Sequence, residues 1–261
     1  MEIRLLGTGG WMPTHLRETA CVYLRDGADA LVLDAGTGFR RLATEPALLE
    51  GVERLHVALT HFHLDHTCGL VGLPAVKHVP VRELWAPGRL VARAPAKEVV
   101  ERLLGPPFLA ADAAKVADGA DAWLSAVREL EGTAEVGPFR LELRVQPLHT
   151  GSTLALKVNG ELAYCTDTAY DEANAAFARG VRLLLHEAFW ADDTTDDFEH
   201  SAAGEAARIA ARGEVERLVL VHLHPLLADE GELAEAARAR FARSEVGRDG
   251  AIFGATSGDP S

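Results

Sequence analysis

Short apolar runs recur along the chain, and most of them end at Gly, Asp or His. Alternating or continuous apolar runs bounded by turn residues predict strands. Asp-Gly at 26–27 and Asn-Gly at 159–160 are turn dipeptides that predict two hairpins. The predicted strands are Ile3–Leu6, Ala20–Leu24, Ala30–Leu33, Leu55–Leu59, Leu84–Ala86, Phe139–Val145, Leu154–Val158, Leu162–Cys165, Val181–Leu185 and Leu218–Val221, with an edge strand at Gly250–Phe253.

Apolar residues three and four positions apart predict helices in other segments. These are Ala96–Leu104, Asp121–Leu130, Ser201–Ala211 and Glu232–Phe241, and a further helix is expected to start at Phe39. Strands come first and then alternate with helices, twice over, with no linker between the halves. The pattern predicts one α/β domain over residues 1–261, with a frayed tail from about residue 254.

In the strand Phe139–Val145, alternation places Leu141, Leu143 and Val145 on one face. The Gly-rich stretch at residues 7–10 has no Gly-Lys-Ser/Thr after it, so we interpret it as a tight turn under the active site, with a nucleotide-binding loop as the alternative.

The composition of the chain narrows the classes of function and the compartment that we expect. The 261 residues are 48% hydrophobic and 25% charged, and the net charge is −13. This balance is globular and argues against broad nucleic-acid binding, which needs basic patches, although a local basic rim stays open. Neither a signal peptide nor an apolar run of membrane-spanning length is present. Cys21, Cys68 and Cys165 are scattered, which is typical of a reducing compartment. We therefore expect a cytoplasmic protein.

The most specific motif is His61-Phe62-His63-Leu64-Asp65-His66, directly after the apolar run Leu55–Leu59. Residues two apart on an extended chain point the same way, so His61 and His63 can face one ion. Imidazole and carboxylate together suit zinc, with iron or manganese as alternatives. The alternative interpretation, a His-rich surface loop, rarely produces this pattern behind a buried strand.

Three further strand ends carry candidate ligands: His149, Asp167 and His222. His224 competes with His222, because it lies two residues on and on the same side of an extended chain. We choose His222 because it directly follows the apolar strand. Asp34, before the segment that opens at Phe39, is expected to cap that helix or to support the histidine motif from behind.

In these motifs the chain resembles the metallo-β-lactamase fold superfamily, in the branch of ribonuclease Z and related phosphodiesterases. The similarity runs through Leu6–Gly9, Leu33–Gly38, the histidine motif, Thr166–Thr168, His186–Ala188, His200–Ala202 and the strand ending at His222. It implies a four-layer αββα sandwich with metals at one edge between the sheets.

The resemblance also implies a ligand set for two Zn²⁺ ions, with Mn²⁺ or Fe²⁺ as alternatives. His61, His63 and His149 would hold one ion, Asp65, His66 and His222 the other, and Asp167 would bridge them. Relatives of this kind are often dimers, which implies a homodimer by analogy.

Catalysis follows from the same resemblance. Two divalent cations lower the pKa of a shared water, so that hydroxide serves as the nucleophile. His200 matches a position that contacts the scissile phosphate and helps the leaving oxygen to accept a proton. Glu187 would orient His200 and keep it protonated. The expected catalytic residues are therefore Asp65, His200 and Glu187.

Ribonuclease Z proper carries a long basic arm between the equivalents of His149 and Asp167, and here only a short hairpin separates them. We therefore expect a phosphodiesterase with a small-molecule substrate, such as a cyclic nucleotide or an alkyl phosphodiester. Nucleic acid as partner stays open, as in transfer-RNA 3′-end cleavage. Hydrolysis of a carbon ester, thioester, lactone or sulfate at the same site also stays open, as does a non-catalytic module that binds metal or a partner.

Overall fold

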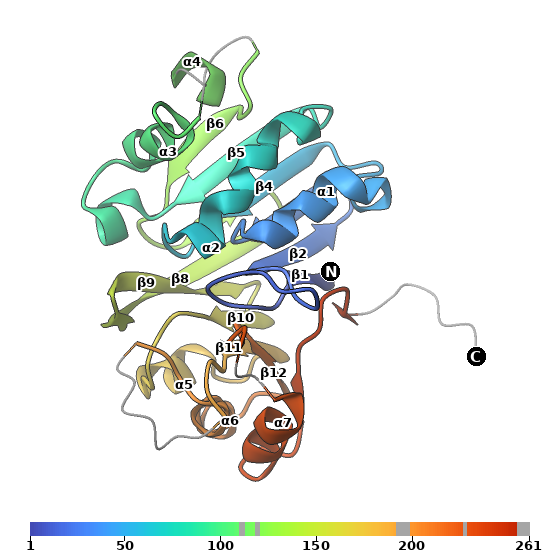
Figure 1. Ribbon diagram of the computed structural model, residues 1–261, viewed down its shortest axis with the longest axis vertical. Coiled ribbons are helices and arrows are strands. Elements are labelled where there is room, and N and C mark those ends of the chain that lie inside the picture. The colour runs from blue at the N-terminus through green and yellow to red at the C-terminus, as the bar shows by residue number, and fades with distance from the viewer. Residues whose placement is uncertain (110–112, 118–120, 192–198, 227–228, 255–261) are drawn as a thin grey trace.

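Two seven-stranded sheets lie face to face, with helices on the outer side of each (Figure 1). The computed structural model describes residues 1–109, 113–117, 121–191, 199–226 and 229–254. The layers confirm the αββα sandwich that the resemblance implies. No helix in these ranges is long and apolar enough to cross a membrane.

The first sheet comes from the N-terminal half of the chain, with one edge strand from the C-terminal end. Its order is β14 (Ile252–Phe253), β1 (Glu2–Gly7), β2 (Cys21–Asp26), β3 (Asp29–Leu33), β4 (Arg54–Ala58), β5 (Val81–Ala86) and β6 (Ala126–Glu129). Strands β3 to β6 are parallel, so their carboxyl ends share one edge of the sheet. The helical segments of this half are η1 (Thr37–Arg40), α1 (Arg41–Thr44), η2 (Pro46–Leu48), α2 (Leu64–Thr67), η3 (Cys68–Val76), η4 (Gly88–Ala92), α3 (Ala96–Leu104) and α4 (Ala113–Val116).

The second sheet comes from the C-terminal half. Its order is β13 (Ser244–Val246), β12 (Arg217–Val221), β11 (Leu183–Glu187), β10 (Leu162–Cys165), β9 (Gly151–Val158), β8 (Phe139–His149) and β7 (Ala134–Val136). Helices α5 (Ala173–Phe177), α6 (Ala203–Arg212) and α7 (Glu230–Arg238) cover its outer face. Strands β10 to β13 are parallel, so this sheet also gathers carboxyl ends at one edge.

Three apolar clusters fill the spaces between the layers. The central one joins the sheets, because side chains of β2 such as Val22 and Leu24 pack with residues of β9 and β12 such as Leu156 and Val219. Their neighbours in β2 face the outer helices instead, as the two-residue period of a strand requires. The shared central cluster supports our proposal that residues 1–261 form one domain.

Both predicted hairpins are present, as β2–β3 and β9–β10. The prediction of a helix over Asp121–Leu130 is wrong, because β6 (Ala126–Glu129) runs there and pairs with β5. This half-buried edge strand gains main-chain hydrogen bonds from its neighbour, which outweigh a local preference for helix.

The predicted alternation of β8 is also incomplete. Leu141 is buried, but Val145 is 39% exposed and Gln146 is buried instead. The amide of Gln146 donates to the hydroxyl of Thr153 and to the carbonyl of Thr166, so a satisfied polar group takes the inner position.

Candidate metal centre

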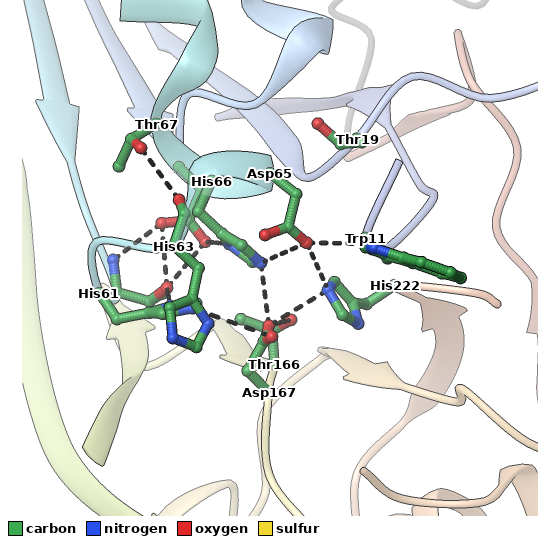
Figure 2. A network of polar contacts seen from close by, with 12 residues as sticks. Trp11, Thr19, His61, His63, Asp65, His66, Thr67, Thr166, Asp167 and His222 are labelled. Carbon is green, nitrogen blue, oxygen red and sulfur yellow. Dashed lines mark hydrogen bonds and ion pairs between the residues drawn. The ribbon is translucent and has the colours of Figure 1, made fainter. Parts of the chain in front are cut away.

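The strand ends converge on one site, as Figure 2 shows. The loop after β4 carries His61 and His63, and α2 supplies Asp65 and His66. From the second sheet come the end of β8 and the turns after β10 and β12, which carry the remaining three predicted ligands, His149, Asp167 and His222. The site thus lies where the carboxyl ends of both sets of strands meet.

These seven side chains form two groups that share Asp167. One group is His61, His63, His149 and Asp167, and the other is Asp65, His66, Asp167 and His222. Within each group the ligating atoms all lie within 4.8 Å of one another. Two four-residue groups with one shared carboxylate have the composition of a dinuclear metal site.

The carboxylate of Asp167 divides its two oxygens between the groups. Oδ1 lies 3.8 Å from Nε2 of His61 and 3.7 Å from Nε2 of His149. Oδ2 lies 3.0 Å from Nε2 of His66 and 3.4 Å from Nε2 of His222. Asp167 therefore lies between the two groups and contacts both.

Asp34 supports the histidine motif from behind. It accepts hydrogen bonds from the amide and hydroxyl of Thr60 and from Nδ1 of His66 at 2.8 Å. The last contact turns Nε2 of His66 toward the site, as a carboxylate behind a metal-binding imidazole does. The following helical segment η1 has no side-chain cap, so of the two predicted roles the structure shows the supporting one.

His222 lies in the site, and His224 does not lie in either of the two groups. Nε2 of His222 is 3.3 Å from Oδ2 of Asp65. The ring of His224 turns toward Trp11 and Phe189, and its Nδ1 accepts a hydrogen bond from the amide of Leu226. The geometry thus favours His222 as the ligand from this strand end.

The donor set fits a pair of divalent cations. Nε2 of His61 and Nε2 of His66 are buried and make no hydrogen bond of good geometry to the described residues, although Oδ2 of Asp167 lies 3.0 Å from Nε2 of His66. The buried carboxylate of Asp167 lies beside both, and that of Asp34 beside the ring of His66. Buried imidazole lone pairs beside buried negative charge need either protons or metal ions.

The excess of negative charge in the site also shifts the pKa values of its side chains. Burial disfavours the charged form of His222, but Asp167, Asp65 and Glu187 outweigh it and raise its pKa to about 10. Burial also opposes the charge on Asp167, yet the neighbouring imidazoles, first His222 and then His66, hold the pKa of this carboxyl well below its ordinary value. The cluster therefore attracts positive charge, which a metal ion would supply in place of protons.

Four residues of the site adopt the left-handed backbone conformation although none is glycine. They are Trp11, Asp34, Asp167 and His222, with φ between 50° and 62°. Each such residue costs about 1 kcal/mol or more, and strain of this kind gathers at functional sites. Gly10 is needed beside them for a different reason, because a Cβ at this position would lie 2.5 Å from Cε1 of His222.

The predicted catalytic pair lies beside the second group. Nδ1 of His200 donates to Oε2 of the buried Glu187 at 2.9 Å, and the same oxygen lies 3.5 Å from Nδ1 of His222. Burial lowers the pKa of His200, but the charge of Glu187 outweighs this and raises it above the ordinary value. His186, by contrast, is buried in the strand and bonds to the main-chain oxygen of Glu187.

Sequence reasoning missed three contributors to the site. The amide of Trp11 donates to Oδ2 of Asp65 at 2.8 Å, and the carbonyl of Glu199 accepts from Nδ1 of His149 at 3.0 Å. The ring of Phe189 stacks on His200, with centroids 4.2 Å apart. Main-chain groups carry no residue signature, although an aromatic pair following His186-Glu187-Ala188 is a signal that could have been used.

The site opens into a cleft of about 420 Å³. Its lining residues are Trp11, His63, Asp65, His149, Thr150, Asp167, Phe189, Glu199, His200, His222 and His224. The size suits a small molecule or one segment of a larger one.

Comparison with known proteins agrees with this geometry. A family model described as "Beta-lactamase superfamily domain" matches residues 30–223. The ribonuclease Z of Natronomonas pharaonis is 28% identical in an alignment of 271 positions that covers 85% of this chain and 87% of that protein.

Two solved structures share the fold. The metallo-beta-lactamase fold protein YhfI from Bacillus subtilis superposes with a TM-score of 0.78 at 19% identity, covering 97% of this chain and 99% of that one. A diphosphatase from the PhnP family gives a TM-score of 0.70 at 17% identity, covering 98% of both chains.

Proposed function

This chain belongs to the beta-lactamase superfamily, and from that premise we propose that it is a metal-dependent hydrolase that cleaves a small phosphodiester. The observation that carries the proposal is the shared carboxylate of Asp167, which joins two groups of ligating atoms. Because the fold hosts several chemistries, the proposed reaction depends on the residues of the site and not on the fold.

The proposed ligands divide into two sets that share Asp167. His61, His63 and His149 would hold one ion, Asp65, His66 and His222 the other, and Asp167 both. Zn²⁺ suits this set of nitrogen and oxygen donors, with Mn²⁺ or Fe²⁺ as alternatives. Bound divalent cations would supply an activated water at neutral pH and neutralise charge on a phosphate oxygen.

The chain's own residues supply proton transfer. His200 lies at the wall of the cleft, and Glu187 keeps its proton on by direct hydrogen bonding. A protonated imidazole can give its proton to the oxygen of a departing alcohol, which a neutral one cannot. Asp65, held by the Trp11 amide, keeps a carboxylate oxygen at the centre of the site.

The cleft favours a small substrate. Only the hairpin of β9 and β10 lies between His149 and Asp167, so the basic arm of ribonuclease Z has no counterpart there. Lys and Arg are absent from the described residues that line the cleft, which disfavours a substrate with many negative charges.

The similarity to the ribonuclease Z of Natronomonas pharaonis supports a second candidate function, endonucleolytic cleavage of a transfer-RNA precursor, since this chain spans most of the length of that protein. The test compares the zinc- and manganese-loaded protein on bis-p-nitrophenyl phosphate, p-nitrophenyl acetate, a thioester and a transfer-RNA precursor.

We expect the unaltered protein to hydrolyse the phosphodiester. We expect Asp167→Ala to lose both this hydrolysis and bound metal. Hydrolysis of the acetate or thioester without the phosphodiester would contradict the phosphodiesterase proposal. Cleavage of the precursor alone would establish the second candidate.

A further inference from the structure

An exposed tryptophan lies at the mouth of the cleft. Trp11 is 59% exposed, and of the large exposed apolar side chains among the described residues it alone lines the cleft. Figure 2 shows its indole beyond His222, with its main chain beside Asp65. A solitary exposed apolar side chain is ordinary, but one beside a reaction centre is placed to meet what binds there.

The chain holds Trp11 firmly in that place. Its φ of 62° is unfavourable for a bulky residue, yet its amide donates to Asp65 at 2.8 Å. The preceding residue is tied as well, because the amide of Gly10 donates to the carbonyl of Leu223 at 3.0 Å. Strain kept by such contacts points to a position that function requires.

Aromatic rings continue from Trp11 along the wall of the cleft. The ring of His224 meets the indole edge-to-face with centroids 6.0 Å apart, and Phe189 lies 4.5 Å from His224. Phe189 in turn stacks on His200. One side of the cleft is therefore a row of rings that begins at an exposed indole and reaches the proposed proton donor.

We propose that Trp11 is a specificity-determining residue that stacks on a planar aromatic group of the substrate, a nucleobase or an aryl ring next to the scissile phosphodiester. The proposal rests on the phosphodiesterase function inferred above and adds the substrate class. Stacking on an indole is tolerant of the identity of the ring, because every base presents a π-face. The lack of Lys and Arg in the described lining agrees with a substrate that carries a single negative charge.

The test measures binding, so that it does not depend on turnover. Adenosine 5′-monophosphate and ribose 5-phosphate share a phosphate and differ in the planar base, and each is titrated calorimetrically into the zinc-loaded protein. We expect the nucleotide to bind about tenfold more tightly, as base stacking on an aromatic side chain implies. Trp11→Ala should bring the two affinities together, and Trp11→Phe should keep most of the difference.

A matched control is Leu16→Ala. Leu16 is 68% exposed and lies near Trp11 in the sequence, but it does not line the cleft, so this variant should keep the tenfold difference. Metal content of each variant shows that Asp65 is still in place. Equal affinities in the unaltered protein, binding of neither ligand, or an undiminished difference in Trp11→Ala would overturn the proposal.

The two proposals fail in different ways. Preferential binding of the nucleotide without hydrolysis of any phosphodiester would support the role of Trp11 and contradict the phosphodiesterase function. Hydrolysis of the phosphodiester with no preference for the base would support the phosphodiesterase function and contradict the role of Trp11.

Discussion

Replacing Gly10 by alanine tests whether His222 has to stand where it does. A Cβ at position 10 would lie 2.5 Å from Cε1, 2.6 Å from Nδ1 and 2.8 Å from Nε2 of His222, whereas ordinary contact begins at 3.4 Å. The Gly10 backbone cannot retreat freely, because its amide is bonded to Leu223. The imidazole must therefore move by about 1 Å, roughly the gap between these contacts and van der Waals separation.

A shift of that size exceeds what a metal site accepts. Ligand distances are kept within about 0.2 Å, and a misplacement of about 1 Å in an active site costs about a hundredfold in rate. We expect Gly10→Ala to bind less than two equivalents of zinc, measured by plasma emission after gel filtration. Turnover of bis-p-nitrophenyl phosphate should fall at least about a hundredfold.

The control is Gly132→Ala, since a Cβ at Gly132 meets nothing within 4 Å. Gly10 has no positive φ, so the substitution acts through contact with the ring and not through backbone strain. Circular dichroism of both variants separates a local effect from loss of the fold. Full metal content and full turnover in Gly10→Ala would show that the position of His222 is not critical, and the proposed ligand set would then have to be revised.

Further predictions concern single side chains. Asp34→Asn should weaken zinc affinity about ten- to a hundredfold in a chelator competition, and unchanged affinity would remove its supporting role. His200→Ala should keep both metals and lose about a hundredfold in turnover, and retained turnover would exclude it as the proton donor. His222→Ala should lower the metal count while His224→Ala should not; the opposite result would exchange their roles. Burial lowers the pKa of His56 below 6.5, so the folded state binds fewer protons than the unfolded chain as the pH falls. The free energy of unfolding, measured in urea, should therefore fall more steeply from about pH 7.5 to about pH 5.5 than it does in His56→Gln. Equal slopes in the two proteins would contradict this.

The sequence allowed prediction of those parts of the site that depend on residue type at strand ends. His61 and His63 follow a buried strand at a two-residue spacing, and this alone places both rings together. His222 could be preferred over His224 because the apolar strand ends just before it. In both cases a short-range rule was sufficient: side-chain direction for the first pair, and distance from the end of the strand for the second.

Features that depend on contacts between distant segments could not be predicted in the same way. The role of Asp34 stayed open because its partner His66 is 32 residues later in the chain. The hydrogen bond from the Trp11 amide to Asp65 uses a main-chain group that every residue type but proline provides. The helix predicted over Asp121–Leu130 is wrong because the pairing of β6 with β5, across some 40 residues, decides the conformation there.

The proposed metal ligands come from both halves of the chain, and this affects the stability of the fold. His63 comes from the first sheet and His149 from the second, 86 residues apart, yet their ring nitrogens lie 3.3 Å from each other. His63 and His149 would hold one ion between the two halves of the sandwich, so removal of that ion would destabilise the whole fold. Chelation should therefore lower the melting temperature by an amount that grows with the tightness of binding, so that the concentration of the free cation would tune the stability of the fold.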